Sequence, residues 1–147
     1  EDKFAAVLEP GQRLVGEWLA QAHGTRYAIP DAVEPFAPFD LMVGNVRSEM
    51  TYCRVVIQWL RDHGLNIYGP GVVHVGEPIA VSCAYNRLCN TQSVFLPVDE
   101  PEGIVYRVEN DGAVEFLCKW VKQDKADGCY LPEISGFEAV WNRRIEE

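Results

Sequence analysis

Apolar and polar residues alternate most regularly in the last third of the chain. Residues 101–109 and 113–122 are rich in β-branched and aromatic residues, and the sequence Asn-Asp-Gly at 110–112 separates them. An Asp-Gly pair supplies the positive φ that a tight hairpin turn requires. The pattern therefore predicts one antiparallel hairpin, with the Glu102 carboxylate at the start of its first strand and two lysines near the end of its second. Taken alone, this hairpin is equally consistent with ordinary solvated charges at its ends.

Shorter patterns upstream predict further strands and two short helices. The predicted strands cover residues 14–19, 33–42, 72–75 and 93–98. One short helix is predicted before Pro10-Gly11, and another is predicted from Gly76-Glu77-Pro78 to Cys89, because proline suits the first helical turn. The tail, residues 123–147, holds apolar anchors in a turn-rich stretch, which predicts an ordered segment lying over the core.

The clearest predicted helix runs from Ser48 to His63. Ser48 is a natural N-cap, and Gly64 follows as a C-terminal stop. An apolar stripe at helical spacing predicts a face packed against the core rather than a cofactor contact. The stripe consists of Tyr52, Val55, Val56, Trp59 and Leu60.

Length and composition indicate a globular chain with one domain. The 147 residues suffice to bury a substantial core, and 48% of them are hydrophobic. No apolar run approaches the roughly 20 residues of a membrane span, so we expect no membrane association. The chain shows no signal peptide and does not begin with Met, which is typical of a trimmed or partial chain.

Five cysteines occur without a Cys-x-x-Cys pair. An odd number without such pairing predicts reduced thiols in a cytoplasmic protein, several of them packed as small apolar groups. The three histidines show no zinc-ligand spacing relative to the cysteines, which argues against a zinc site.

The net charge of −9 argues against a broad phosphate-binding surface. Only small basic clusters occur, at Lys119, Lys122 and Lys125 and at Arg143-Arg144. A nucleic-acid enzyme with this composition would need either locally concentrated positive charge or a separate segment that holds the nucleic acid.

Four short motifs give the chain a resemblance to a known family. They are Gly16-Glu17-Trp18-Leu19, Phe36 to Leu41, Glu102 to Arg107 and Lys119 to Lys122. In this order and with these gaps they resemble motifs III, IIIa, IV and V of the nucleotidyltransferase domain of ATP-dependent polynucleotide ligases, most closely the RNA ligase branch. The resemblance covers nearly the whole chain, and the order of four motifs is far more specific than any one of them.

The resemblance implies an α+β fold in which antiparallel sheets form a nucleotide cleft with flanking helices. Residues 1–147 would then be a partial RNA-ligase-like domain that lacks its N-terminal part. The implied activity transfers AMP from ATP to a lysine, then to a 5′-phosphate, which a 3′-hydroxyl attacks. ATP or AMP and Mg²⁺ are the implied cofactors, and RNA ends would be bound through parts outside this chain.

The resemblance also implies roles for individual residues. Glu17 would accept a hydrogen bond from the AMP ribose, and Glu102 would help to hold Mg²⁺ through oxygen ligation. Phe39 would stack on adenine, with Phe36 as the alternative, because the two lie on opposite faces of a regular strand. Each of these residues is also compatible with an ordinary structural role, as an exposed charge or a core aromatic.

The lysines of the fourth motif depart from the family pattern. The family generally has Lys-x-Lys, so that both amines face the phosphate, whereas Val121 occupies the second position here. On a regular strand Lys119 would neutralise the α-phosphate, and Lys122 would reach it only if the strand kinks or bulges. Trp120 would point away from Lys119 and pack.

The nucleophilic motif Lys-x-Asp-Gly is missing from its expected place, so whether this chain is an enzyme stays open. Only Lys3 precedes Glu17 closely, and no Asp-Gly follows it. Lys125-Ala126-Asp127-Gly128 has the right spelling but comes last, which favours a solvated turn over a permuted site. Two alternatives remain: a non-catalytic pseudo-ligase that binds nucleotide or protein, and an unrelated acidic α+β interaction module.

Overall fold

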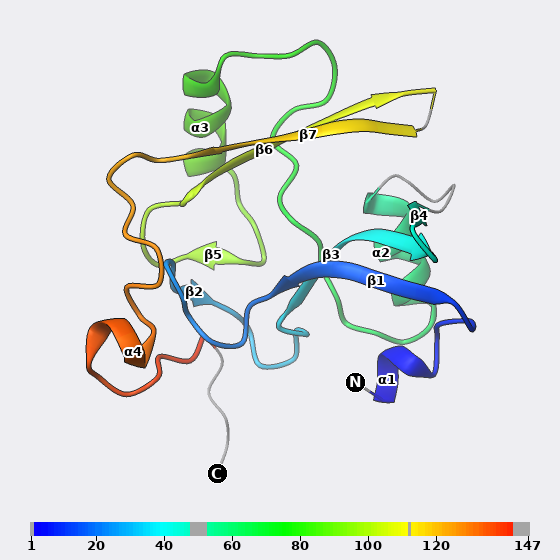
Figure 1. Cartoon of the computed structure of the whole chain (residues 1–147), viewed down its shortest axis with the longest axis horizontal. Coiled ribbons are helices and arrows are strands. Elements are labelled where there is room, and N and C mark those ends of the chain that lie inside the picture. The colour runs from blue at the N-terminus through cyan, green and yellow to red at the C-terminus, as the bar shows by residue number, and fades with distance from the viewer. Residues whose placement is uncertain (1, 48–52, 112, 143–147) are drawn as a thin grey trace.

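Three small antiparallel sheets and four helices make up the computed structural model, which describes residues 2–47, 53–111 and 113–142 (Figure 1). The sheets have the strand orders β1-β3-β4, β2-β5 and β6-β7. In chain order the elements are α1 (Asp2–Ala5), β1 (Gln12–Trp18), β2 (Tyr27–Ala28), β3 (Phe36–Val43), β4 (Val46–Arg47), α2 (Cys53–Asp62), α3 (Val81–Asn90), β5 (Leu96–Pro97), β6 (Gly103–Asn110), β7 (Ala113–Val121) and α4 (Pro132–Ser135). The predicted α+β class with antiparallel sheets is confirmed.

The pairing of β1 with β3 contains a β-bulge that changes which side chains share a face. Val15 pairs with Asp40 and Gly16 pairs with Pro38, so Phe39 is an extra residue in β3. As a result Phe36 and Leu41, five residues apart, both contact the same apolar cluster. An unbroken strand would place them on opposite faces.

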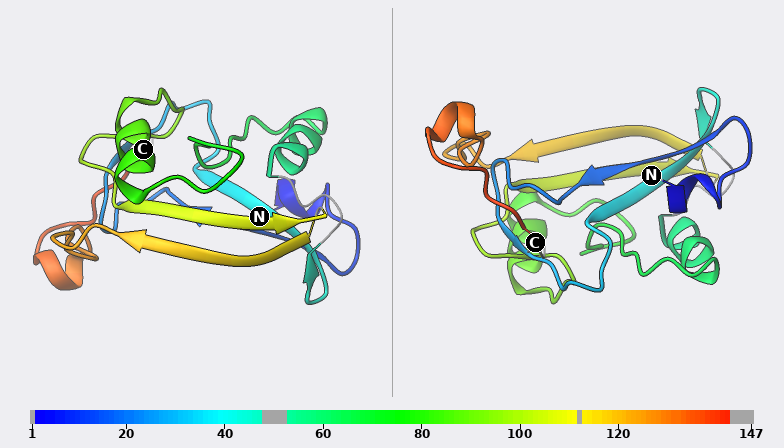
Figure 2. Two further views of the ribbon diagram at one scale, coloured as in Figure 1. Left: turned by 90° about the horizontal axis from the view of Figure 1, so that it is seen from above. Right: turned by 90° about the horizontal axis from the view of Figure 1, so that it is seen from below.

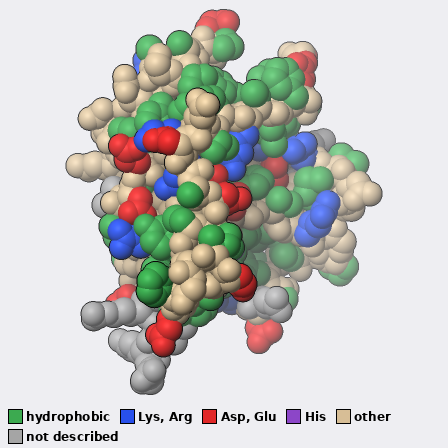
Figure 3. Space-filling model, turned by 60° about the vertical axis from the view of Figure 1, so that its left-hand side comes forward, with side chains coloured by type: hydrophobic (Ala, Val, Ile, Leu, Met, Phe, Trp, Pro, Cys, Tyr) green, Lys and Arg blue, Asp and Glu red, His purple; other side chains and the backbone are tan. Residues whose placement is uncertain are grey.

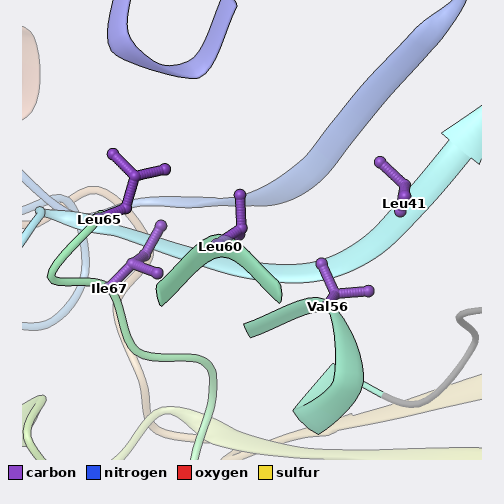
Figure 4. Close-up of a cluster of buried hydrophobic side chains, with 5 residues drawn as sticks. All are labelled: Leu41, Val56, Leu60, Leu65 and Ile67. Atoms are coloured by element: carbon purple, nitrogen blue, oxygen red, sulfur yellow. The ribbon is translucent and has the colours of Figure 1, made fainter. Parts of the chain in front are cut away.

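The main apolar cluster joins the β1-β3-β4 sheet to α2 (Figure 4). Its buried members are Leu41, Val56, Leu60, Leu65 and Ile67. Val56 and Leu60 are fully buried, as their place in the predicted stripe requires, but Val55 is 47% exposed, so the prediction is wrong for that residue. Its neighbour at position 56 takes the core-facing position. Gly64 has a φ of 84°, as expected for a helix stop, whereas the predicted N-cap Ser48 and stripe residue Tyr52 lie outside the described residues.

The predicted hairpin is confirmed as β6 and β7, and Asp111 in its turn has a φ of 49°. Val105 pairs with Lys119, so these two residues lie on one face of the hairpin. The opposite face carries Trp120, whose ring lies 5.4 Å from that of Tyr85 in α3. The hairpin therefore has one face covered by α3, while the Lys119 face is directed away from that helix.

Three sequence predictions differ from the structure. Residues 72–75 form no strand: Val72 and Val75 are exposed between glycine-rich turns, and none of the described strands runs alongside to pair with them. The strand predicted at 93–98 is reduced to β5. Pro78 lies ahead of α3, which begins at Val81, because the backbone of Ala80 is still extended.

The described part of the tail contacts the loop between β1 and β2 through its backbone, but Ile134, Phe137 and Trp141 are at least 50% exposed, so the prediction that these apolar side chains anchor the tail on the core is wrong for them. The Ala22 N–H donates to the Val140 carbonyl, the Tyr130 N–H donates to the His23 carbonyl, and Gln21 pairs with Trp141 in an isolated β-bridge. Figure 2 shows α4 at one end of the molecule, far from α1. Among the helices in the described part of the chain, none has the length and apolar character needed to cross a membrane.

The cysteines are less buried than the composition suggested. Cys83, Cys89 and Cys118 are exposed free thiols, and Cys129 is a half-buried one. The prediction that several pack as small apolar groups is therefore wrong for the first three, because the elements that carry them turn those positions to solvent. The structure does not describe the side chain of Cys53.

Candidate functional site

Glu102 and Lys119 form an ion pair where the hairpin begins and ends. The Lys119 Nζ donates to the Glu102 Oε1 at 3.2 Å, and the two side chains are 59% and 34% exposed, respectively. Glu102 immediately precedes β6, and Lys119 lies two residues before Val121, the last paired position of β7, so both residues lie at the same end of the hairpin. Because both side chains remain partly open to solvent, a ligand can reach either one.

Lys122 is turned to different partners. Its backbone N–H donates to the Glu102 carbonyl at 2.9 Å, but its amine pairs with Glu100 and, at 3.4 Å, with Asp124. The hydrogen bond to Glu100 is the main reason that the pKa of Lys122 is raised. The bulge of the hairpin lies near Glu109, far from the lysines, so β7 is regular here and the Lys122 amine points away from the Glu102 carboxylate.

The hydroxyl of Tyr27 in β2 is influenced by the charges of both Glu17 and Glu102. Burial is the largest cause of the raised pKa of Tyr27, the negative charges of Glu102 and Glu17 raise it further, and a hydrogen bond with Thr25 opposes them. The charges of both carboxylates therefore act on the Tyr27 hydroxyl. Figure 1 shows β2 near the end of the hairpin where β6 begins and β7 ends, and at that end Glu102 pairs with Lys119.

Thr25 adds a buried hydroxyl beside this group. The residue is 4% exposed, and its Oγ1 has no partner at normal hydrogen-bond distance among the described residues, although it lies near enough to the Tyr27 hydroxyl to lower the Tyr27 pKa. A buried hydroxyl without a well-formed hydrogen bond costs free energy, so a hydrogen-bond partner supplied by water or by a ligand would stabilise it.

Gly16 fixes the position of Glu17 through close packing of β1 on β3. A Cβ at residue 16 would lie 2.6 Å from the Ala37 carbonyl oxygen and 2.7 Å from the Phe36 ring, distances that no side chain tolerates. The glycine of the Gly-Glu-Trp motif is thus required by the strand contact. Glu17 follows it on the other face of β1 and is exposed.

The two candidate aromatic residues have different surroundings. Phe36 packs against the main apolar cluster, with its ring 5.5 Å from that of Phe4 in an edge-to-face contact and 6.4 Å from that of Trp18. Phe39 is half-buried at the bulge and belongs to neither apolar cluster. Of the two, Phe39 therefore has the ring that remains available to a ligand.

Asp40, Arg47 and Arg107 form a network that was not predicted from the sequence. Asp40 is 3% exposed, and it accepts hydrogen bonds from the Arg107 Nη2 at 2.7 Å and from the Arg47 Nε at 3.1 Å. Arg107 also pairs with Glu109 at 2.6 Å. This network ties the middle of the hairpin to the β1-β3-β4 sheet and so holds Glu102 and Glu17 in register. The only sequence signal was that Asp40 and Arg107 fall inside two of the recognised motifs.

The Lys125-x-Asp-Gly segment forms a turn against the β1–β2 loop. The Lys125 N–H donates to the Lys122 carbonyl at 3.1 Å, and its amine lies 3.4 Å from the Glu100 carbonyl. Gly128 has a φ of 67° in this turn. The geometry is that of a tail segment packed beside the site, and the Lys125 amine is directed to Glu100 rather than to Glu102.

The donor set is compatible with a metal that arrives together with a phosphate ligand. Among residues 2–47, 53–111 and 113–142, no three acidic, His or Cys side chains lie close enough together to hold a metal ion by themselves. Mg²⁺ commonly binds through one or two carboxylates, waters and substrate phosphates. Glu102 fits that mode and does not fit a closed all-protein site.

Positive and negative side chains are interspersed on the face shown in Figure 3, where α3, β7 and α4 lie, and no broad positive area interrupts them. This agrees with the net charge of −9. No family model, curated protein or solved structure matches the chain. The functional interpretation therefore depends on the geometry and on the order of the four motifs.

Proposed function

We propose that residues 1–147 are the nucleotide-binding part of an RNA-ligase-like nucleotidyltransferase, which binds ATP or AMP with Mg²⁺ and in its complete form seals RNA ends. The observation that supports this most is the Glu102–Lys119 pair at one end of the hairpin, together with the action of the Glu17 and Glu102 charges on the same Tyr27 hydroxyl. Glu17, Glu102 and Lys119 come from three of the four motifs, which are distant from one another in sequence.

The proposed chemistry is in-line displacement at the α-phosphate, in which positioning and charge neutralisation dominate. Lys119 would donate to a non-bridging phosphate oxygen in place of its contact with Glu102, and Glu102 would help to hold Mg²⁺, which would neutralise phosphate charge. Glu17 accepts a hydrogen bond from the ribose, and Phe39 stacks on adenine. The exchange is cheap because the Glu102–Lys119 pair is exposed, and exposed pairs contribute at most about 1 kcal/mol.

The second candidate is a pseudo-ligase that binds a nucleotide without transferring it. Neither lysine that could be the nucleophile is placed for that role: the Lys3 amine pairs with Glu34 at 2.5 Å, and the Lys125 amine faces the Glu100 carbonyl. Both functions require the same nucleotide site, so binding is the first property to test.

Calorimetric titration of the chain with AMP, and with ATP and Mg²⁺, tests the nucleotide site. We expect saturable binding, weakened at least tenfold by Glu17→Ala or Phe39→Ala and unchanged by Glu115→Ala, which removes an exposed charge in β7 that bonds Asn110. Absence of binding, or equal weakening by all three substitutions, would contradict the proposal.

Incubation with α-labelled ATP and Mg²⁺ separates enzyme from pseudo-ligase for this chain. We expect nucleotide to bind without forming a covalent adduct, because no Lys-x-Asp-Gly lies ahead of Glu17. An acid-stable, hydroxylamine-labile label on Lys125 would show instead that the turn at 125–128 is a permuted nucleophile.

A further inference from the structure

A second concave site lies between α2 and the segments around Tyr68 and Ser93. It encloses about 390 Å³ and shares no residue with the candidate nucleotide site. Its lining residues include Arg54, Gln58 and Arg61 from α2. Because these occur at positions i, i+4 and i+7, they share one face of the helix, and both arginines are directed to the same hollow.

Arg61 is held in a fixed orientation. Its Nε donates to the Ile67 carbonyl at 2.9 Å, and its guanidinium lies over the Tyr68 ring, 4.1 Å from the centroid. A stacked guanidinium with Nε engaged has its remaining N–H groups in a known plane. Neither terminal nitrogen of Arg61 has a hydrogen-bond or ion-pair partner within the described part of the chain.

Arg54 is exposed and likewise has no partner among the residues that the structure describes. The other polar lining groups are also donors: Ser93 accepts from the Phe95 N–H at 3.2 Å, which leaves its hydroxyl proton to donate. None of the lining residues is acidic. Asp62, next to Arg61 in sequence, is engaged by the Gln58 amide at 2.9 Å.

Two arginines without an acidic partner among the described residues line one pocket in a chain with a net charge of −9. Three other arginines pair with carboxylates, Arg26 with Asp99 and both Arg47 and Arg107 with Asp40. Arg13 and Arg87 also have no acidic partner in the described part of the chain, but they lie outside the pocket. A pocket that offers donors and no acceptor charge suits an anion. The planar guanidinium fork, with hydroxyl and amide donors around it, matches the oxygen atoms of a phosphate group.

We propose that this pocket binds a phosphate group, with Arg54 and Arg61 as its principal ligands and Tyr68 as the platform that orients Arg61. The phosphate comes either from a small phosphorylated molecule or from the backbone of a single-stranded RNA. The site acts independently of the nucleotide site at Glu17 and Glu102.

The test uses the whole chain and pyrophosphate as the probe. Nitrogen-detected magnetic resonance follows the Arg61 Nε–H signal, and calorimetry gives the affinity. We expect the Arg61 signal to move on titration, and the Arg54→Gln/Arg61→Gln double variant to weaken binding at least tenfold. Arg87→Gln, which removes an equal charge outside the pocket, should leave the affinity unchanged.

An unchanged affinity in the double variant, or equal weakening by Arg87→Gln, overturns the proposal. Arg61→Lys keeps the positive charge but removes the planar guanidinium donors, so we expect an affinity for pyrophosphate between those of the unmodified chain and the double variant. Urea unfolding of each variant verifies that the fold is retained. A six-nucleotide RNA with a 5′-hydroxyl distinguishes the two sources. Displacement of pyrophosphate by this RNA identifies a backbone phosphate, and failure to displace it identifies a small phosphorylated molecule.

Discussion

The middle and the end of the β6–β7 hairpin both contain acid–base contacts, but the contacts differ in kind. In the middle, Arg107 reaches across to Asp40, which is 3% exposed and shared with Arg47. At the end, Glu102 and Lys119 form a single pair with much of both side chains in solvent. The buried network cannot change partners without unfolding, whereas the exposed pair can exchange its partner for a ligand.

This difference separates a structural role from a chemical one. Removing one member of a buried charge network leaves its partners uncompensated in a poorly solvated place. Removing one member of an exposed pair leaves its partner hydrated. We therefore expect the middle of the hairpin to determine stability and its end to determine ligand binding, and the following substitutions test that division.

The largest effect is expected for Asp40→Ala. The substitution leaves Arg47 and Arg107 without their shared carboxylate, and we expect the free energy of unfolding to fall by about 3 kcal/mol or more. Urea unfolding followed by tryptophan fluorescence measures the loss. Arg47→Gln is the matched control, since Arg47 is the more exposed arginine and its loss leaves Asp40 paired with Arg107. Equal losses in the two variants would mean that the carboxylate is not the centre of the network.

Lys119→Ala should have the largest effect on ligand binding. A charge-assisted hydrogen bond contributes roughly 1.5–3 kcal/mol, so we expect the Kd for ATP with Mg²⁺ to rise about ten- to a hundredfold. Lys122→Ala should change the Kd far less, because its amine is engaged by Glu100 and Asp124. Calorimetry of the two variants decides between the lysines. A loss confined to Lys122→Ala would mean that the motif is aligned to the wrong residue.

Asp99 is an intermediate case, between the tail and the β1–β2 loop. Its carboxylate accepts from the Arg26 guanidinium at 2.9 Å and from the Tyr130 hydroxyl at 2.7 Å. The hydrogen bond from Arg26 is the main reason that the pKa of Asp99 lies well below its ordinary value of 3.8. Because the pKa of Asp99 is lower in the folded state than in the unfolded state, the charged carboxylate stabilises the folded state above pH 3.8. This contribution is lost as the pH falls through the pKa that Asp99 has in the folded state.

We therefore expect Asp99→Asn to lower the free energy of unfolding by about 1 kcal/mol at neutral pH. The difference between the two proteins should shrink steadily as the pH is lowered below 3.8. Urea unfolding at a series of pH values measures it. A difference that stays constant with pH would show that the contribution of Asp99 is one of packing and not of charge.

The sequence was sufficient for contacts that depend on local pattern. The hairpin followed from two β-rich runs around Asn-Asp-Gly, and its pairing brought Glu102 and Lys119 to the same end, where their side chains pair. Lys122 lies just past the end of β7 and has different side-chain partners from Lys119, namely Glu100 and Asp124. The role of Gly16 was marked only by its motif, because the close approach of Ala37 that requires it depends on register.

The features that the sequence did not predict depend on contacts between distant segments. The bulge at Phe39 arises from the pairing of β3 with β1. The choice of Phe39, or alternatively Phe36, as the residue that stacks on adenine assumed a regular strand, and the bulge breaks that regular alternation of faces. Residues 72–75 have the composition of a strand, but none of the described strands lies beside them to pair with. The composition of a segment does not predict whether a partner strand is available. The Asp40–Arg107 contact joins two sheets, and nothing in either segment alone indicates it.

The smallest expected effect on stability is that of Lys119→Ala, and it tests the contrast between the two ends of the comparison most directly. Lys119→Ala should lower the free energy of unfolding by less than about 1 kcal/mol, because the lysine is 59% exposed and its partner remains hydrated. Urea unfolding of this variant, beside that of Asp40→Ala, measures the contrast directly. A stability loss comparable to that of Asp40→Ala would make Lys119 part of the framework, and its effect on ATP affinity would then report on folding. A small loss with strongly weakened ATP binding would show that the Lys119 charge acts on the ligand itself and not through the stability of the fold.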